Sequence, residues 1–163
     1  MTQFSRRHLL GAGAAAIGAV LTGRALPATA QPHGRFPFML TDAQWRGRLS
    51  ADAYQVLRHE GTERAGTSPL NREHRQGVFS CAGCGQRLFS STTKFDSGTG
   101  WPSFFRPLPH AIVTRADHSL FEARTEVLCA RCGGHLGHVF NDGPRPTGLR
   151  YCMNGVAMTF QPT

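Results

Sequence analysis

The hydrophobic and polar positions before Gly77 follow the period of short helices. The capping-box pattern Thr41–Gln44 predicts the start of a first helix, which carries Trp45 on its apolar side. Ser50 is placed to cap a second amphipathic helix that ends at Gly61. Residues 61–77 are rich in glycine, threonine, serine and charged side chains, which predicts a loop.

From Gly77 onward the pattern changes to short apolar segments separated by turns. Alternating and β-branched residues predict strands at 77–81, 87–89, 111–114, 120–128, 136–140 and 151–160. Glycine and proline punctuate 97–109 and 143–148, where loops that carry function are expected. The chain is therefore predicted to be mainly β, with short helices at its N-terminal end.

The first thirty residues form a segment of their own. Arg6-Arg7 precedes a Gly- and Ala-rich apolar run, and Ala28-Thr29-Ala30 supplies the small residues of a cleavage site. The paired arginines are typical of a twin-arginine export signal. The run is short and weakly apolar for a membrane span, so we expect a signal peptide at 1–30, cleaved after Ala30. An uncleaved N-terminal anchor is the alternative.

The mature chain is then expected to comprise a tether at 31–40 and a single domain at 41–163, exported to the periplasm or beyond and not stably bound to a membrane. The 163 residues, 40% of them hydrophobic, suit one domain with a real core. The net charge of +8 falls to +5 once the three arginines of the signal are removed. The remaining basic residues are scattered, with Lys94 the only lysine, so we do not expect nucleic-acid binding.

Four of the five cysteines form two Cys-x-x-Cys pairs, Cys81/Cys84 and Cys129/Cys132. Two such turns supply the four sulfur ligands of a tetrahedral zinc ion and leave no open position for catalysis. We therefore expect one structural Zn²⁺ per chain, loaded in the reducing cytosol before export. Disulfides or a redox pair are the alternative, because exported proteins meet an oxidising compartment.

The fifth cysteine, Cys152, has no partner by spacing and is a candidate nucleophile. Arg150 and Asn154 lie two residues to either side, so a strand would place them on the face of Cys152. A nearby cation favours the thiolate, which is the reactive form. The alternative is a buried, unreactive thiol, since free cysteine is among the most buried residue types.

Two histidines favour the catalytic interpretation. His135 and His138 are three residues apart and would face opposite sides of a straight strand. Gly134 and Gly137 permit a bulge that turns both side chains to one side. Either histidine is also compatible with a structural role, and Asp142, within Asn-Asp-Gly, is typical of a turn.

Four blocks of the sequence resemble the methionine-R-sulfoxide reductases of the B type (the MsrB family). They are Cys81–Cys84, Lys94–Phe104, Gly134–Gly143 and Arg150–Asn154, and parts of 45–63 look like the family's N-terminal signature. The resemblance covers about 41–160, nearly all of the mature chain. It implies two antiparallel β-sheets with short N-terminal helices, and a structural zinc site of four cysteines opposite the active site.

The resemblance further implies an oxidoreductase, a peptide-methionine (R)-S-oxide reductase that repairs oxidised exported proteins. Cys152 would attack the sulfoxide sulfur and become a sulfenic acid. His135, His138 and Asn154 would hold and protonate the sulfoxide oxygen. Hydrogen-bond donors on one side of the substrate are what its polar S–O bond requires.

Three more residues receive roles from the resemblance. Arg150 and Asp142 would orient the catalytic set, with the arginine favouring the thiolate. Trp101 would form the apolar wall that receives the methyl group of the substrate.

The chain departs from the family at Thr99, where many relatives carry a cysteine that resolves the sulfenic acid as an internal disulfide. No spare cysteine exists in the mature sequence, so a thioredoxin-like or small-thiol reductant must act on Cys152. Gly155 also stands where relatives often have serine. We expect a monomer whose other partners are oxidised protein substrates.

Two other functions stay open on the residues alone. One is a zinc-stabilised exported binding module in which Cys152 is buried and inert. The other is a Cys-His-Asn hydrolase that acts by acyl transfer, since the same residue types support that chemistry.

Overall fold

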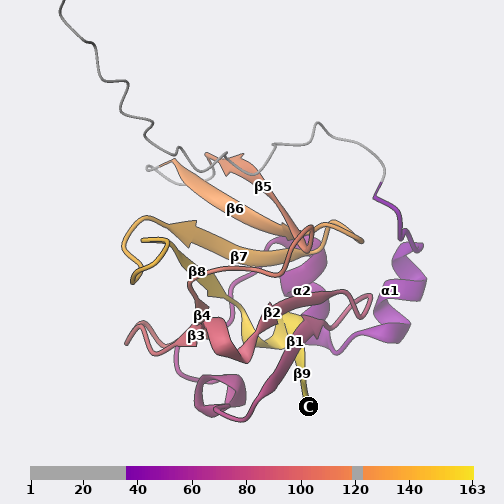
Figure 1. Ribbon diagram of the computed structural model, residues 1–163. Helices are drawn as coiled ribbons and strands as arrows, with labels where there is room; N and C mark the ends of the chain where they lie inside the picture. The colour runs from indigo at the N-terminus through magenta and orange to yellow at the C-terminus, as the bar shows by residue number, and fades with distance from the viewer. Residues whose placement is uncertain (1–35, 119–122) are drawn as a thin grey trace, which may run out of the picture.

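The computed structural model describes residues 36–118 and 123–163 (Figure 1). The predicted signal peptide at 1–30, with its twin arginines and cleavage site, lies outside the described residues and stays a prediction. The domain limits also stay a prediction, because nothing in the structure tests them. Across the described ranges, neither helix combines the length and the apolar character that crossing a membrane requires.

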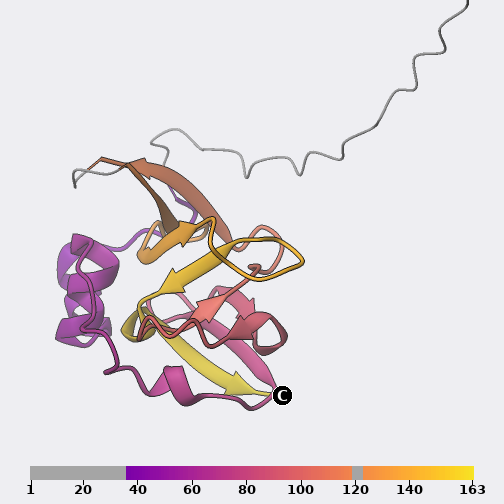
Figure 2. The ribbon, with the colours of Figure 1, turned by 90° about the vertical axis from the view of Figure 1, so that its left-hand side faces the viewer.

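Two short helices begin where the sequence predicts them. Helix α1 spans Asp42–Arg48, and Thr41 and Gln44 form both hydrogen bonds of the capping box. Helix α2 spans Ala51–His59, with the Ser50 hydroxyl accepting from the Ala53 amide. Helix α2 buries its apolar side against strand β7, His135–Phe140, and so lies over one face of a sheet (Figures 1 and 2).

The rest of the chain forms two antiparallel sheets, as predicted. The small sheet has the order β2-β1-β9, with β1 at Gly77–Cys81, β2 at Arg87–Ser90 and β9 at Met158–Pro162. The large sheet has the order β3-β4-β8-β7-β6-β5. Its other strands are β3 Lys94–Phe95, β4 Ser103–Phe104, β5 Ile112–Asp117, β6 Arg124–Cys129 and β8 Arg150–Met153. Single 3-10 turns lie at Pro69–Arg72, Ser91–Thr93 and Gly155–Ala157.

The last predicted strand, 151–160, is wrong as a single element. The chain leaves the large sheet at Met153, makes the turn Gly155–Ala157, and enters the small sheet as β9. The amide of Asn154 donates to the Leu136 carbonyl at 2.8 Å, which ties the start of the turn to β7. The residues keep an apolar, strand-like pattern because both strands bury side chains in the same core.

An aromatic cluster joins the two sheets. Phe79 and Phe89 of the small sheet meet Phe104 of the large sheet, with ring centroids 4.9 and 4.3 Å from it. All three rings have no exposed surface. Full burial of each ring contributes roughly 1.5–3 kcal/mol, so this contact is a main source of cohesion between the sheets.

The part of the predicted tether that the structure describes packs onto the domain. The amide of Phe38 donates to the Arg131 carbonyl at 2.8 Å. Its ring meets Trp45 edge-on at 5.8 Å and lies under the Arg131 guanidinium. Residues 36–40 therefore cover the turn between β6 and β7.

Candidate active site and metal centre

Cys152 lies in β8, between β4 and β7 of the large sheet. It pairs with Ser103 on one side and with His138 on the other. Directly opposite residues of an antiparallel pair point to the same face, so His138 stands beside the thiol. Cys152 is half-buried, whereas the four other cysteines are buried. Cys152 is therefore the most exposed of the five cysteines.

Gly137 lets β7 approach the backbone of Cys152. Its φ is +151°, and a Cβ at this position would lie 2.1 Å from the Cys152 carbonyl oxygen. The register of β6 against β7 shifts beside it, as in a bulge. His135 and His138 consequently lie together, with ring centroids 5.4 Å apart. The bulge that the glycines predicted is confirmed.

His135 is held by a buried carboxylate. Its Nδ1 lies 2.7 Å from Oε1 of Glu126, and both side chains are 3% exposed. Burial acts to raise the pKa of Glu126, but His135 and Arg115 together hold it below its usual value. The ionised carboxylate can only accept, so Nδ1 carries the hydrogen and Nε2 a lone pair in the neutral ring. Nε2 is buried and has no hydrogen-bond partner within the described residues.

His138 is held in a similar way from β5. Its Nε2 lies 2.8 Å from Oδ2 of Asp117, which also accepts from Arg124 at 2.6 Å. Burial lowers the pKa of His138, although Asp117 acts to raise it. The neutral ring donates from Nε2 to Asp117 and keeps a lone pair on Nδ1. Both histidines therefore present one nitrogen that can take up a proton.

Arg150 and Asp142 form a two-pronged ion pair next to the thiol. The arginine Nε and Nη2 donate to the two carboxylate oxygens at 2.9 and 2.8 Å. The bond to Asp142 raises the pKa of Arg150, and the nearby Cys152 adds to the shift. Only 11% of the Arg150 side chain is exposed, and its guanidinium covers the Phe140 ring at 4.4 Å. A fixed cation thus stands beside Cys152.

The side chains of Asn154 and Trp101 are both hydrogen-bonded to the backbone of Glu63. The Asn154 Oδ1 accepts from the Glu63 amide at 2.8 Å, and the Trp101 Nε1 donates to the Glu63 carbonyl at 2.9 Å. Strand β8 ends at Met153, so Asn154 does not share the strand face of Cys152 that the sequence predicted. Its Nδ2 donates one hydrogen to the Leu136 carbonyl at 3.2 Å, which leaves one hydrogen for a ligand.

Thr99 lies against the thiol. Its Oγ1 is 3.8 Å from Sγ of Cys152 and 2.8 Å from Oγ of Ser97. The Ser97 hydroxyl also meets that of Ser103 at 2.7 Å, so three hydroxyls line this edge of the site. The position at which relatives carry a second cysteine is therefore within contact of Cys152.

Gly155 leaves room for a neighbouring serine. A Cβ at Gly155 would lie 1.8 Å from Oγ of Ser68, which is itself buried. The Gly155 amide donates to the Glu63 carboxylate at 2.6 Å. Ser68 and Glu63 thus fill the space that a serine side chain at position 155 would take.

The sequence analysis did not single out Glu63, Asp117 and Glu126. Glu126 is followed by three apolar residues of β6, and an acid within such a strand is a signal of a buried ion pair or hydrogen bond. Asp117 and Glu63 gave no comparable signal, because neither lies within an apolar run of the sequence.

The four zinc-candidate cysteines come together in one buried cluster. Their sulfurs all lie within 4.8 Å of one another, with Cys81 and Cys132 3.7 Å apart and Cys84 and Cys129 3.5 Å apart. Hydrogen bonds among the four thiols lower the pKa of Cys84 and of Cys129. The same network, together with burial, raises the pKa of Cys81 and of Cys132.

The cluster joins the two sheets. One turn connects β1 and β2 of the small sheet, and the other connects β6 and β7 of the large sheet. Three arginines, Arg48, Arg58 and Arg131, donate to backbone carbonyls of Gly83, Cys132 and Cys84 in these turns. Some of the scattered arginines therefore hold the two turns in place.

Comparison with known proteins gives the family. Residues 49–162 match the model of the SelR domain. The chain is 55% identical to the peptide methionine sulfoxide reductase MsrB of Thiobacillus denitrificans, over 75% of this chain and 93% of that protein. It is 52% identical to the protein of that name from Leptospira interrogans, over 74% of this chain and 93% of the other. The half-buried thiol, the paired histidines and the four-cysteine cluster thus stand in an oxidoreductase, and the chain belongs to the SelR domain family of MsrB reductases.

Proposed function

We propose that this chain reduces methionine-R-sulfoxide, mainly within proteins, to methionine, with Cys152 as the nucleophile. One observation carries the proposal: a half-buried thiol is paired across the strands with His138, whose ring packs on His135, and a carboxylate fixes each ring in one orientation. The family supports the reduction of methionine sulfoxide as the reaction class. The choice of the R epimer rests on the resemblance of the motifs.

The residues of the site account for the movement of the proton. A neutral imidazole takes the proton of the Cys152 thiol, and Arg150 stabilises the thiolate that remains. His135 or His138 then returns the proton to the sulfoxide oxygen, which the free hydrogen of the Asn154 amide also binds. Trp101, half-buried and fixed by Glu63, offers the apolar wall for the methyl group.

The reaction balances as an oxygen transfer. The S–O bond of the substrate breaks, an S–O bond to Cys152 forms, and methionine leaves. The sulfoxide is reduced and Cys152 is oxidised to a sulfenic acid. Two external thiol groups, from a small dithiol or a thioredoxin-like protein, then reduce the sulfenic acid and yield a disulfide and water. The described cysteines offer no other thiol near Cys152, because the remaining four form the buried cluster.

We propose that the four-cysteine cluster holds one Zn²⁺. Sulfurs arranged about zinc at roughly 2.3 Å lie about 3.8 Å apart, which fits the two distances of 3.5 and 3.7 Å. Four buried sulfur ligands leave no open position, so the ion would stabilise the fold and take no part in the reduction. The residues of the catalytic site do not include any of these four.

We also propose export by the twin-arginine route, with a mature monomer that repairs oxidised proteins in the periplasm. The paired arginines and the small residues before Gln31 support export. Folding before export is compatible with a metal cluster that needs reduced thiols.

Turnover of separated R and S methionine sulfoxides with a thiol reductant tests the proposed reaction. We expect the R epimer to be consumed, the S epimer to remain, and Cys152→Ser to lose activity while keeping fold and metal. Near-normal turnover by Cys152→Ser would refute the role of the thiol. Ester hydrolysis without any reductant would support the hydrolase instead.

A further inference from the structure

A groove of about 330 Å³ runs from Trp101 to the segment after the Pro69–Arg72 turn. Its walls are tied together by three hydrogen bonds. The Gly66 amide and the Asn71 side chain both donate to the Gly100 carbonyl, at 2.8 and 2.9 Å. The Lys94 ammonium donates to the Asn71 carbonyl at 2.9 Å. These bonds join the two walls in one arrangement, so the groove exists before any ligand binds.

The groove is basic. Arg72, His74 and Lys94 line it, and Asp96 is the only acid among its lining residues. Arg72 and His74 are exposed and make no hydrogen bond or ion pair with any residue in 36–118 or 123–163. Glu73, which lies between them in sequence, is bound by Arg75 at 2.9 and 2.6 Å. The side chains of Arg72 and His74 are therefore available to a ligand.

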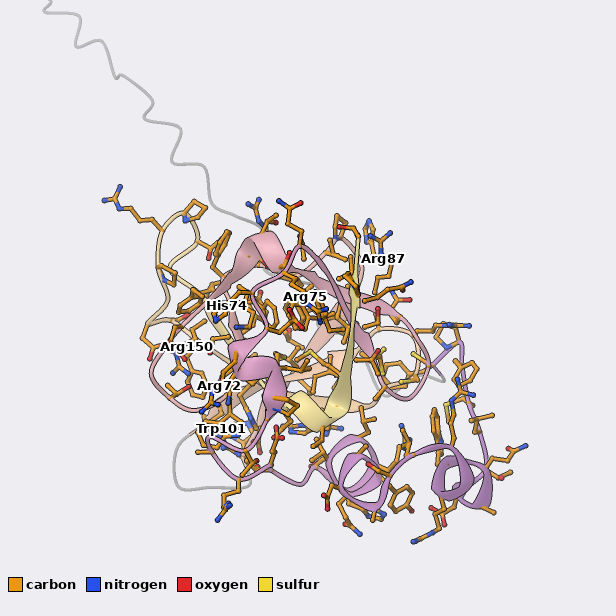
Figure 3. The ribbon with its side chains drawn as sticks, turned by 90° about the horizontal axis from the view of Figure 1, so that it is seen from below. Arg72, His74, Arg75, Arg87, Trp101 and Arg150 are labelled. Atoms are coloured by element: carbon orange, nitrogen blue, oxygen red, sulfur yellow. The ribbon has the colours of Figure 1, made fainter. Side chains whose placement is uncertain are left out.

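The groove adjoins the catalytic site. Trp101 belongs to its lining, and Thr99, two residues earlier, touches the sulfur of Cys152 at 3.8 Å. The Pro102 carbonyl accepts from the Met153 amide at 3.0 Å, which fixes this segment against β8. Figure 3 shows Arg72 and His74 on the side of the molecule where Trp101 and Arg150 also lie. A peptide whose oxidised methionine reaches Cys152 would extend past these two basic side chains.

We propose that this groove binds acidic side chains that flank the oxidised methionine, so that the enzyme prefers acidic segments of its substrate proteins. The inference rests on the proposed function, because it places the sulfoxide against Trp101. Its physical basis is the attraction of free surface cations for a carboxylate in a formed depression. Each such pair contributes about a two- to fivefold preference, and salt screens it.

Matched peptides test the proposal. Each carries one methionine-R-sulfoxide with either aspartate or asparagine at the flanking positions, and a small dithiol serves as reductant so that no protein partner takes part. The readout is the ratio of kcat/KM for the two peptides, which a general loss of activity does not change. We expect a ratio of about two to five in wild type at low salt, and a ratio near one at high salt.

Two variants locate the effect. Arg72→Gln should lower the ratio at low salt, whereas Arg87→Gln should not. Arg87 is an exposed arginine of β2 on the opposite side of the molecule in Figure 3. A ratio of one in wild type, or the same ratio in wild type and Arg72→Gln, would overturn the groove proposal while reduction of both peptides upheld the proposed function. If wild type reduces neither peptide, the proposed function itself fails.

Discussion

At the scale of single residues, the site depends on two carboxylates that fix the orientation of two imidazole rings. Glu126 and Asp117 each hold one ring nitrogen of a histidine, and each carboxylate is itself bound by an arginine. This arrangement determines which nitrogen carries the hydrogen and which one keeps a lone pair. On the proposed function the carboxylates are positioning residues, since they would act on the substrate through the imidazoles.

Glu126→Gln tests this role. A neutral amide can donate to Nδ1 of His135, which allows the opposite tautomer and leaves Arg115 with one partner fewer. We expect kcat to fall by about 10²-fold with KM nearly unchanged, because the proton transfer suffers more than binding. Steady-state kinetics with a sulfoxide peptide measures both constants.

The control for this variant is Asp52→Asn, which removes an exposed acid of α2. A circular dichroism spectrum like that of wild type shows that Glu126→Gln is folded. Unchanged kcat in a folded Glu126→Gln enzyme would contradict the proposed function of the carboxylate.

Thr99→Cys tests the regeneration step. Oγ1 of Thr99 lies 3.8 Å from Sγ of Cys152, so a sulfur in its place needs only a small shift to form a disulfide. After one turnover without reductant, wild type should hold a sulfenic acid that a dimedone-type probe traps. Thr99→Cys should instead hold an internal disulfide and react little with the probe. Mass spectrometry of the oxidised proteins distinguishes the two.

Thr159→Cys, which adds an exposed thiol on β9, serves as the control and should react with the probe like wild type. A stoichiometric disulfide in wild type between Cys152 and a cysteine of the metal cluster, with activity kept over many cycles, would disprove this account.

At the scale of elements, the close approach of β7 and β8 brings the candidate catalytic groups together. Gly137 makes that approach possible, and the bulge beside it turns His135 toward His138. The turn Gly155–Ala157 then sends the chain from one sheet into the other shortly after Cys152, the proposed nucleophile. The site therefore lies where the chain passes between its two sheets.

Gly137→Ala should separate these strands. A methyl group 2.1 Å from the Cys152 carbonyl oxygen forces a backbone shift, for which we expect a loss of at least ~2 kcal/mol in unfolding free energy and a large loss of activity. Gly47→Ala in α1 is the matched control, because a Cβ there meets nothing within 4 Å. It should stabilise the protein slightly. Urea unfolding of both variants measures the difference, and equal stabilities would show that the strands adapt.

The sequence predicted what local interactions determine. Helix starts follow from Thr41 and Ser50, whose side chains bond amides within the same turn. The two-residue strands β3 and β4 are too short to show a period, and the sequence analysis did not predict them. Asp117 was also missed, because its bond to His138 joins β5 to β7 across a sheet order that the sequence does not display.

At the scale of the whole molecule, the cysteine cluster and the aromatic cluster join the same two sheets. The two clusters differ in how much they stabilise the fold. A structural zinc site contributes on the order of 10–16 kcal/mol at neutral pH, as much as the full stability of a typical domain. The metal is therefore expected to decide whether the sheets stay together.

Removal of the metal tests this expectation. The purified protein should contain one zinc per chain, and a strong chelator, or Cys129→Ser, should unfold it and abolish activity. Cys152→Ser is the control and should keep its zinc. Metal analysis and circular dichroism follow both effects. A folded, active sample without zinc would show that the cluster does not need the ion.

The hydroxyl of Thr99 beside the Cys152 sulfur has a consequence for how long the protein stays active under oxidative stress. A thiol at this position would allow the oxidised state to be stored as a disulfide. On the proposed route, the sulfenic acid of this chain would instead wait, half-exposed, for a donor from outside. Whenever that supply fell behind, a second oxidant would compete for the same atom and drive it to the irreversible sulfinic acid. The working lifetime of each molecule is then set by the reducing capacity around it, and chains would be lost fastest where repair is needed most.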